Sequence, residues 1–167
     1  MDTNKNKGMY IEVIINNSIN FYCLNKIALF RKQGLQIKIV SITNNDVTGK
    51  LSSKCDVDYY GIYKGKFIAI EANHTKNNFF VLNNIMKHQI DFLNNIVDYG
   101  GLSYIVIYFQ SSQNIYFIDY RKFYSNFIKS KDCKKRIYET WFINNALKLE
   151  IIYQGRIDFI KKIELDL

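Results

Sequence analysis

The sequence predicts an α/β fold in which a mixed central sheet is flanked by helices. Three features of the 167 residues support this prediction. Apolar residues recur at helical spacing near the N-terminus and again in residues 83–99. Between these segments, residues 56–73 read as strand, turn and strand. Apolar strands then follow at residues 103–109 and 114–119, so that helices and strands are mixed along one chain.

The N-terminal region combines a polar start with an amphipathic helix. Residues 1–8 are polar and are expected to be mobile. Residues 9–25 are predicted as a helix, because isoleucines and a tyrosine recur on one face. Glu12 shares a face with Ile15 and Ile19, which is compatible with an inward orientation of its carboxylate.

Two strands and a polar segment follow this helix. Residues 27–32 and 36–42 alternate between apolar and polar side chains, as strands do. Residues 43–55 are polar and basic and are expected to form a flexible loop. The chain has no repeat and no Pro/Gly/Ser-rich linker, and its length suits one domain, so we expect residues 1–167 to form a single domain.

Residues 56–73 carry the most informative pattern. A turn at residues 64–65 joins a strand that holds Asp56 and Asp58 to an apolar strand that holds Glu71. A carboxylate inside an apolar strand is costly unless another group compensates it, and a hairpin brings Asp58 close to Glu71. Facing carboxylates repel one another unless a cation lies between them. A hard divalent ion with oxygen ligands, Mg²⁺ or Mn²⁺, is the simplest such cation.

The C-terminal half continues the alternation of helices and strands. Residues 83–99 are predicted as a helix that Gly100-Gly101 ends. Its expected buried stripe consists of Met86, Ile90, Leu93 and Val97. The remaining predicted elements are a loop at 74–82, helices near 121–129 and 136–147, and strands near 149–153 and 157–164. The aromatic residues expected in the core are Tyr59, Tyr60, Tyr63, Phe67 and Trp141.

The net charge of +8 is unevenly distributed. Residues 1–54 carry eight Lys/Arg against three acids, residues 121–136 carry seven against one, and residues 55–120 carry four against six. One interpretation is compositional drift, because the chain lacks proline and is rich in residues that A/T-rich codons encode. The other is a nucleic-acid-binding surface, in which basic segments flank a central acidic site.

Composition also narrows the class of protein. The chain has no run of eighteen apolar residues and no apolar segment at its N-terminus, so neither a membrane span nor a secretory signal is predicted. Three scattered cysteines are typical of reduced thiols, and we expect a cytoplasmic location. With only two histidines, a Cys/His zinc site is not expected.

Several motifs resemble the RecU-type Holliday junction resolvases, a family of PD-(D/E)xK nucleases. The run Asp58-Tyr59-Tyr60-Gly61-Ile62-Tyr63-Lys64-Gly65, followed by Glu71-Ala72, is similar to the active-site hairpin of that family. Further similar motifs, in chain order, are Gly8-Met9 with Glu12, His88-Gln89-Ile90, Gly100-Gly101 with residues 105–107, and Arg156-Ile157-Asp158-Phe159. The resemblance implies a restriction-endonuclease-like fold, a homodimer, and a stalk at about residues 43–55 that enters a four-way DNA junction.

The resemblance also implies roles for individual residues. Asp58 and Glu71 would bind Mg²⁺ or Mn²⁺, and Gln89 would orient a ligand or the attacking water. Glu12 would bind a second metal or hold the water network; alternatively, it is a helix carboxylate that the helix dipole favours. Asp56 stands where the family usually has threonine, and either binds metal or is a solvated strand end.

One departure from the family concerns the catalytic lysine. The family motif reads Glu-x-Lys, and this chain has Asn73 at the lysine position. Three outcomes remain open. A nearby lysine (Lys64, Lys66 or Lys76) replaces the missing charge; the metal carries more of the catalysis, which favours Mn²⁺; or the site is inactive. Loss of a positioned electrostatic group typically slows a reaction by ~10²–10³-fold, so slow cleavage is the expectation.

Basic clusters are expected to contact DNA. In the stalk and at its base, the expected DNA contacts are Arg31, Lys32, Lys38, Lys50 and Lys54. Near the active site they are Lys64 and Lys76. Residues 121–136 would form a second DNA-binding strip.

The implied activity is metal-dependent hydrolysis of junction phosphodiesters in DNA recombination and repair. A recombinase or branch-migration proteins are further expected partners. Two alternatives remain: a junction-binding protein that has lost turnover at Asn73, and a related nuclease with another substrate.

Overall fold

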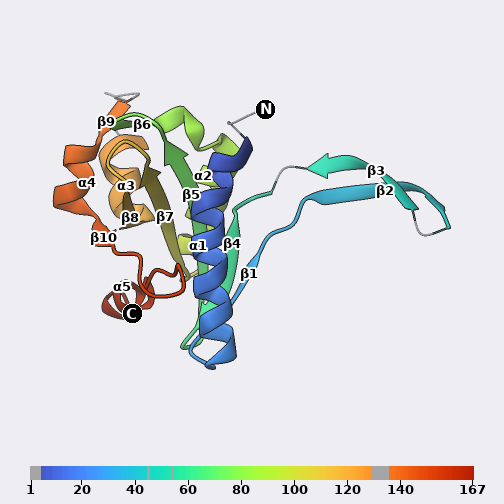
Figure 1. Cartoon of the computed structure of the whole chain (residues 1–167), viewed down its shortest axis with the longest axis horizontal. Helices are drawn as coiled ribbons and strands as arrows, with labels where there is room; N and C mark the ends of the chain where they lie inside the picture. Colours follow the sequence, from blue (N-terminus) through green and yellow to red (C-terminus); the bar gives the residue numbers. More distant parts are fainter. Residues whose placement is uncertain (1–4, 45, 54, 129–135) are drawn as a thin grey trace.

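The computed structural model describes residues 5–44, 46–53, 55–128 and 136–167. A six-stranded mixed sheet forms its centre (Figure 1). In spatial order its strands are β1 (Leu29–Lys32), β4 (Tyr59–Tyr63), β5 (Lys66–Thr75), β7 (Leu102–Phe109), β8 (Asn114–Asp119) and β10 (Leu147–Leu149). The central pair β5 and β7 is parallel, and the other neighbours are antiparallel. The predicted α/β fold with a mixed central sheet is therefore confirmed.

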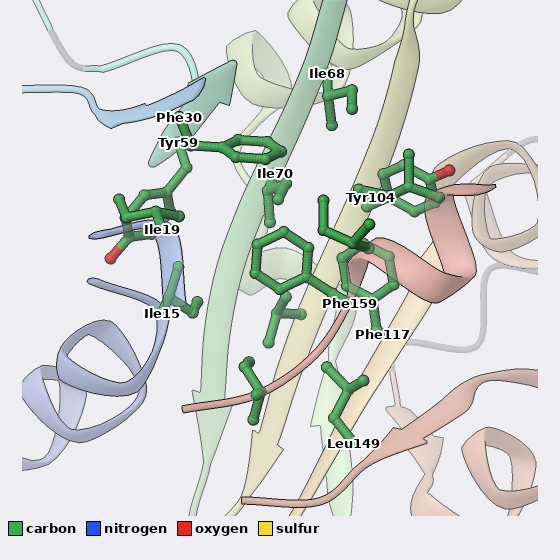
Figure 2. Close-up of a cluster of buried hydrophobic side chains, with 14 of the residues drawn as sticks. Ile15, Ile19, Phe30, Tyr59, Ile68, Ile70, Tyr104, Phe117, Leu149 and Phe159 are labelled. Carbon is green, nitrogen blue, oxygen red and sulfur yellow. The ribbon is translucent and has the colours of Figure 1, made fainter. Parts of the chain in front are cut away.

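Helix α1 (Lys5–Leu24) and the C-terminal helix α5 (Ile160–Leu165) cover one face of the sheet. Figure 2 shows the apolar cluster on this face, to which α1 contributes Ile15 and Ile19 and β5 contributes Ile68 and Ile70. These side chains are at most 6% exposed, so the helical spacing found in the sequence marks the buried face of α1. Residues 1–4 of the segment expected to be mobile lie outside the described residues, and the rest of that segment is helical.

The opposite face carries α2 (Lys87–Asp98), α3 (Tyr120–Phe123) and α4 (Glu139–Asn145). A second apolar cluster lies between these helices and the sheet and includes Leu93 and Phe142. Because both faces of β5 and β7 are covered, the strand that holds Glu71 lies in the interior. None of the described helices is long and apolar enough to cross a membrane.

Strands β2 (Gln36–Thr43) and β3 (Asp46–Ser53) form a hairpin that extends away from the sheet (Figure 1). The prediction of a flexible loop at residues 43–55 is wrong for β3, because its backbone pairs with β2 from Asp46 to Ser53, with two register shifts. A polar sequence does not prevent this pairing, since backbone groups alone form the ladder.

Other predictions differ in their bounds or type. The predicted strand at 157–164 is wrong, because Ile160 and Ile163 face the core at helical spacing in α5. The helix expected at 136–147 is α4 preceded by strand β9 (Arg136–Tyr138), which pairs with β6 (Phe79–Val81). The remaining adjustments are a 3₁₀ turn at Leu82–Asn84 before α2, a π-helical turn at Tyr124–Ile128 after α3, and β10 two residues before its predicted start.

Three residues predicted to be buried are exposed. Met86 precedes α2 and is 45% exposed, so it does not belong to the buried stripe. Tyr60 and Phe67 stack on one another on the outer face of the β4–β5 hairpin, where no described helix covers them. The alternation of β4 therefore buries Tyr59 and Tyr63 and leaves Tyr60 outside.

Two glycines shape the β4–β5 hairpin, one in its turn and one where β1 lies against it. Lys64 and Gly65 both have positive φ, 46° and 77°, as a two-residue turn between twisted strands requires. Gly61 lies against β1, and a Cβ atom there would come within 2.3 Å of the Leu29 carbonyl oxygen. Glycine at position 61 thus lets β1 pair with β4.

The C-terminal motif Arg156-Ile157-Asp158-Phe159 fastens the end of the chain to α1. The Ser18 hydroxyl accepts a hydrogen bond from the Ile157 N–H (2.9 Å) and donates to the Ile14 carbonyl (2.9 Å). The Tyr22 hydroxyl accepts from the Phe159 N–H (3.2 Å). These buried polar groups are satisfied only while α1 and the C-terminal segment stay together.

Ser18→Ala should lower the free energy of unfolding by about 1–3 kcal/mol, because it leaves the buried Ile157 N–H without a partner. Urea denaturation of the full chain measures this change. Ser125→Ala removes an exposed hydroxyl that bonds within its own turn and should cost less than about 0.5 kcal/mol. Equal stability of the two variants would contradict the role given to Ser18.

Candidate active site

Asp58 and Glu71 lie together where the pairing of β4 and β5 stops. The ladder ends at Tyr59 opposite Ile70, so the next two residues, Asp58 and Glu71, face one another. Strand β5 continues to Thr75, and the Asp58 Oδ2 accepts a hydrogen bond from its free edge, at the Ala72 N–H (2.8 Å). The Asp58 carboxylate thus takes the place of a strand partner.

Glu71 is buried, and only one of its oxygens is satisfied. Its side chain is on the α2 side of the sheet, and the residue is 3% exposed. The Oε1 atom accepts hydrogen bonds from Gln89 Nε2 (2.7 Å) and Asn73 Nδ2 (3.3 Å). The Oε2 atom is the buried side-chain polar atom without a hydrogen-bond partner among the described residues. A buried carboxylate oxygen of this kind requires a cation or a proton.

The electrostatics of the pair lead to the same conclusion. Burial, and then the negative charge of Asp58, raise the pKa of the Glu71 carboxyl. Burial also raises the pKa of Asp58, as does the negative charge of Glu12, whereas the Ala72 N–H and Lys32 lower it. Two carboxylates that resist ionisation at one place, with hard oxygen atoms and an unsatisfied lone pair, fit a divalent metal ion.

Asp58 and Glu71 alone would not complete the coordination shell of a divalent ion. In the described parts of the chain, no three His, Cys, Asp or Glu side chains gather closely enough to hold an ion. Further ligands would therefore be backbone carbonyls, water or phosphate oxygens, as is usual for Mg²⁺.

Gln89 joins α2 to the pair. It is the third residue of the helix, and its Oε1 accepts the Met86 N–H (2.8 Å) while its Nε2 donates to Glu71. The backbone bond fixes which end of the amide points to the carboxylate. Gln89 thereby holds Oε1 of Glu71 and leaves Oε2 available.

Glu12 and Lys32 approach from the α1 side. A cleft of about 470 Å³ is lined by Glu12, Lys32, Asp58 and the segment that connects β1 to the hairpin. The Lys32 ammonium lies 2.5 Å from the Glu12 carboxylate. The sequence predicted Lys32 in a DNA-binding cluster at the base of the stalk, whereas its position beside Glu12 was not predicted. The apolar Phe30 could have indicated this position. Side chains two residues apart on a strand share a face, so Lys32 lies on the same face of β1 as the buried Phe30.

Two of the three lysines proposed to replace the motif lysine lie far from Asn73. Lys64 pairs with Glu164 (2.7 Å) and Lys66 donates to the Gly100 carbonyl (3.2 Å), both at the opposite end of β5. Five residues of strand separate Lys66 from Glu71, which is about 17 Å. Lys76 is exposed just beyond the end of β5, three residues after Asn73.

Two further residues are not brought to the pair. Asp56 is half-buried, and among the described residues it does not join Asp58 and Glu71 in a group that could hold a metal ion. Arg31 points to the outer face of the sheet, where it lines a small apolar hollow with Leu29 and Tyr60.

The basic clusters are only partly described. Lys38 and Lys50 pair across the β2–β3 hairpin, and both are exposed. Lys54 and residues 129–135 of the second basic strip lie outside the described residues. The two end residues of that strip are described. Arg121 forms an ion pair with Asp119 (2.9 Å), and the Arg136 guanidinium lies over the Phe79 ring.

Comparison with known proteins identifies the family. The profile of the RecU family, described as Recombination protein U, matches residues 6–165. A Holliday junction resolvase RecU of Ureaplasma parvum is 39% identical over 161 residues, covering 96% of this chain and 93% of the relative. The corresponding protein of Mycoplasmopsis pulmonis is 36% identical, with 93% and 92% covered, and that of Staphylococcus aureus is 30% identical, with 95% and 80% covered.

A solved structure is also similar. The Holliday junction resolvase Hjc of Archaeoglobus fulgidus is 11% identical and aligns with a TM-score of 0.46, over 77% of this chain and 90% of that one. The family profile covers nearly the whole chain, and the U. parvum relative is well above 30% identical. The chain therefore belongs to the RecU family.

Proposed function

We propose that this protein is a metal-dependent endonuclease that cuts four-way DNA junctions during recombination. The observation that carries the proposal is the buried Glu71, whose Oε2 lacks a partner while the like-charged Asp58 faces the same place. A protein that only binds DNA gains nothing from burying two carboxylates together. Relatives that cover nearly the whole chain are named Holliday junction resolvases, which supports the substrate.

The residues of the site divide the work of hydrolysis. A bound Mg²⁺ or Mn²⁺ would polarise the scissile phosphate and lower the pKa of a bound water. Asp58 and Glu71 would hold the ion, and Gln89 keeps the Glu71 carboxylate oriented through Oε1. The attacking water would lose one proton to solvent as its oxygen bonds to phosphorus; the bond from phosphorus to the 3′ oxygen breaks, and that oxygen takes up one proton from solvent to leave as the alcohol. Asn73 has no charge to offer, so we expect slow turnover.

We propose that the active form is a homodimer. Symmetrical resolution of a junction needs two nicks on opposing strands, which a twofold dimer can place. The β2–β3 hairpin supports association, because its exposed apolar residues each remain at least 55% exposed: Ile37, Ile39, Val40, Ile42, Val47 and Leu51. A lone two-stranded hairpin is marginally stable in water, so packing against a second hairpin would stabilise it. The cytoplasmic location and contacts with a recombinase or branch-migration proteins stay predictions from the sequence and the family resemblance.

A labelled four-way junction incubated with Mn²⁺ should receive paired nicks on opposing strands, and Glu71→Ala should abolish them by removing a metal ligand. Denaturing gel analysis of the products measures this. Glu150→Ala, which removes an exposed carboxylate, should cut normally. Tight junction binding by the native chain without any cutting would instead support the alternative of a non-catalytic binder.

Divalent metal should stabilise the protein, and more at pH 8 than at pH 5.5. The pKa of Glu71 is raised above its ordinary 4.5, so the contribution of this group to stability is greatest below that pH and is lost as the pH rises. An ion that binds the ionised pair offsets this loss and competes with fewer protons at pH 8. An excess of ~100 times Kd gives roughly 2.7 kcal/mol, or a Tm increase of about 5–10 °C.

Thermal unfolding with and without Mn²⁺ measures this stabilisation. Glu71→Gln should remove the Tm increase and should not destabilise the metal-free protein at pH 8, because it puts a neutral amide in place of a carboxyl whose ionisation is opposed by burial. Glu150→Gln should retain the full increase, since that carboxylate is exposed. An undiminished increase in Glu71→Gln would place the ion elsewhere.

Lys38→Ala/Lys50→Ala should weaken junction binding and make it less dependent on salt, because both lysines lie side by side on the extended hairpin. Each lost phosphate contact reduces the slope of log affinity against log salt by roughly one. Titrations of a labelled junction at several salt concentrations measure the slope. Lys148→Ala/Lys161→Ala, which removes the same charge near the C-terminus, should bind like the native chain.

A further inference from the structure

A cavity away from the active site lies between the C-terminal half of α1 and the segment that leads into α5. Its volume is about 390 Å³, and most of its lining is apolar: Phe21, Tyr22, Ile27, Tyr63, Ile152 and Ile160. Tyr63 ends β4 at the hairpin turn, whereas Asp58 precedes the other end of that strand. Five residues of strand, about 17 Å, therefore separate the Tyr63 side of the cavity from Asp58.

Arg156 lines this cavity and has no ionic partner among the described residues. Its guanidinium carbon lies 3.7 Å from the centre of the Phe21 ring, and its Nε donates to the Tyr153 carbonyl (3.2 Å). Its two terminal nitrogens donate no hydrogen bond to any part of the chain that the structure describes. The N–H groups of these nitrogens form the planar fork that binds a carboxylate or a phosphate.

The acids that line the same cavity are already paired with lysines. The Glu164 carboxylate lies 2.7 Å from the Lys64 ammonium, and Asp158 Oδ2 lies 3.9 Å from that of Lys161. The charge that remains available to a ligand is therefore the positive charge of Arg156. An anionic group with an apolar neighbour would match both the cation and the lining.

The backbone holds Arg156 in position before any ligand binds. Ile152 and Arg156 form a backbone bridge, in which the Ile152 N–H donates to the Arg156 carbonyl (2.8 Å). The Asn17 amide of α1 donates to the Gly155 carbonyl (3.2 Å) and so fastens this loop to the helix. A second hollow of about 230 Å³, with amide side chains in its lining, also contains Arg156. Such a preformed site binds a ligand without the cost of ordering its own groups.

We propose that this cavity is a docking site for a partner protein, whose bound segment carries an acidic residue beside a large apolar one. The carboxylate would accept hydrogen bonds from the Arg156 fork, and the apolar side chain would fill the cavity. Ile27 and Ile152 are 40% and 43% exposed and would be covered by the partner. DNA fits less well, because a phosphate backbone has no large apolar group to bury there. The inference goes beyond the proposed nuclease function and does not rest on it.

The test selects random peptides displayed on phage against the full-length protein. The recovered peptides are synthesised with a fluorescent label, and their affinities are measured by anisotropy. Their sequences should combine Asp or Glu with a neighbouring Leu, Ile or Phe. Arg156→Gln should weaken their binding by about 10–100-fold, because a buried carboxylate loses charged donors. Arg136→Gln removes an arginine that also lies over a phenylalanine ring, outside the cavity, and should bind the peptides like the native chain.

Two further variants distinguish docking from a defect in folding. Ile27→Asp changes an exposed side chain, so it should keep the native Tm, and it should weaken peptide binding about 10-fold by placing an acid in the cavity lining. Ile143→Asp, the same change at a 61% exposed position of α4, should have no effect. Arg156→Lys keeps the charge without the fork, and its loss of affinity should be smaller than that of Arg156→Gln.

Junction assays on the same variants keep this inference separate from the proposed function. Arg156→Gln and Ile27→Asp should bind and cut a four-way junction like the native chain, because the cavity lies at the other end of β4 from Asp58. Recovery of no peptide whose affinity depends on Arg156 would overturn the inference. If Arg156→Gln then also lowered junction affinity, Arg156 would be a phosphate contact instead. A native chain that cuts no junction but binds peptides through Arg156 would overturn the nuclease function and support the docking site.

Discussion

The buried carboxylate of Glu71 is the constraint around which the site is built. A carboxylate in the interior needs a partner for each oxygen, and the described chain supplies amide donors to Oε1 only. The nearby charge that most affects it, Asp58, has the same sign. The fold tolerates this arrangement because apolar side chains pack on both faces of β5. The free energy gained by that packing offsets the unfavourable burial of one carboxylate. Such a local cost is expected where a ligand completes the structure.

An interrupted ladder opens the site. β4 stops pairing with β5 at Tyr59, although β5 continues for five more residues. The free edge of β5 would present unpaired N–H groups, and the Asp58 carboxylate accepts one of them at Ala72. The same interruption lets helices reach the pair from both faces of the sheet, α2 through Gln89 and α1 through Glu12. Strand pairing thus determines both where the acids lie and what surrounds them.

The sequence predicted the parts of this arrangement that depend on local pattern. The placement of Asp58 opposite Glu71 followed from the turn at residues 64–65 and strand alternation, and the structure has that register. The C-terminal strand was wrong because apolar residues spaced by three fit a short helix as well as an irregular strand. The exposure of Tyr60 could not be predicted from the sequence. It depends on how much of that sheet face is covered by helices distant in sequence. Contacts such as that between Glu12 and Lys32 join residues twenty positions apart and need the assembled sheet.

Asn73 shows why a site can lose its motif lysine without losing its shape. Its amide donates to Oε1 of Glu71, so one hydrogen bond of the carboxylate is kept while a positive charge is given up. A lysine at that position would lie next to a buried anion and partly neutralise it; an amide leaves the full negative charge for a divalent ion. In the proposed nuclease, the substitution would favour metal binding at the expense of phosphate stabilisation.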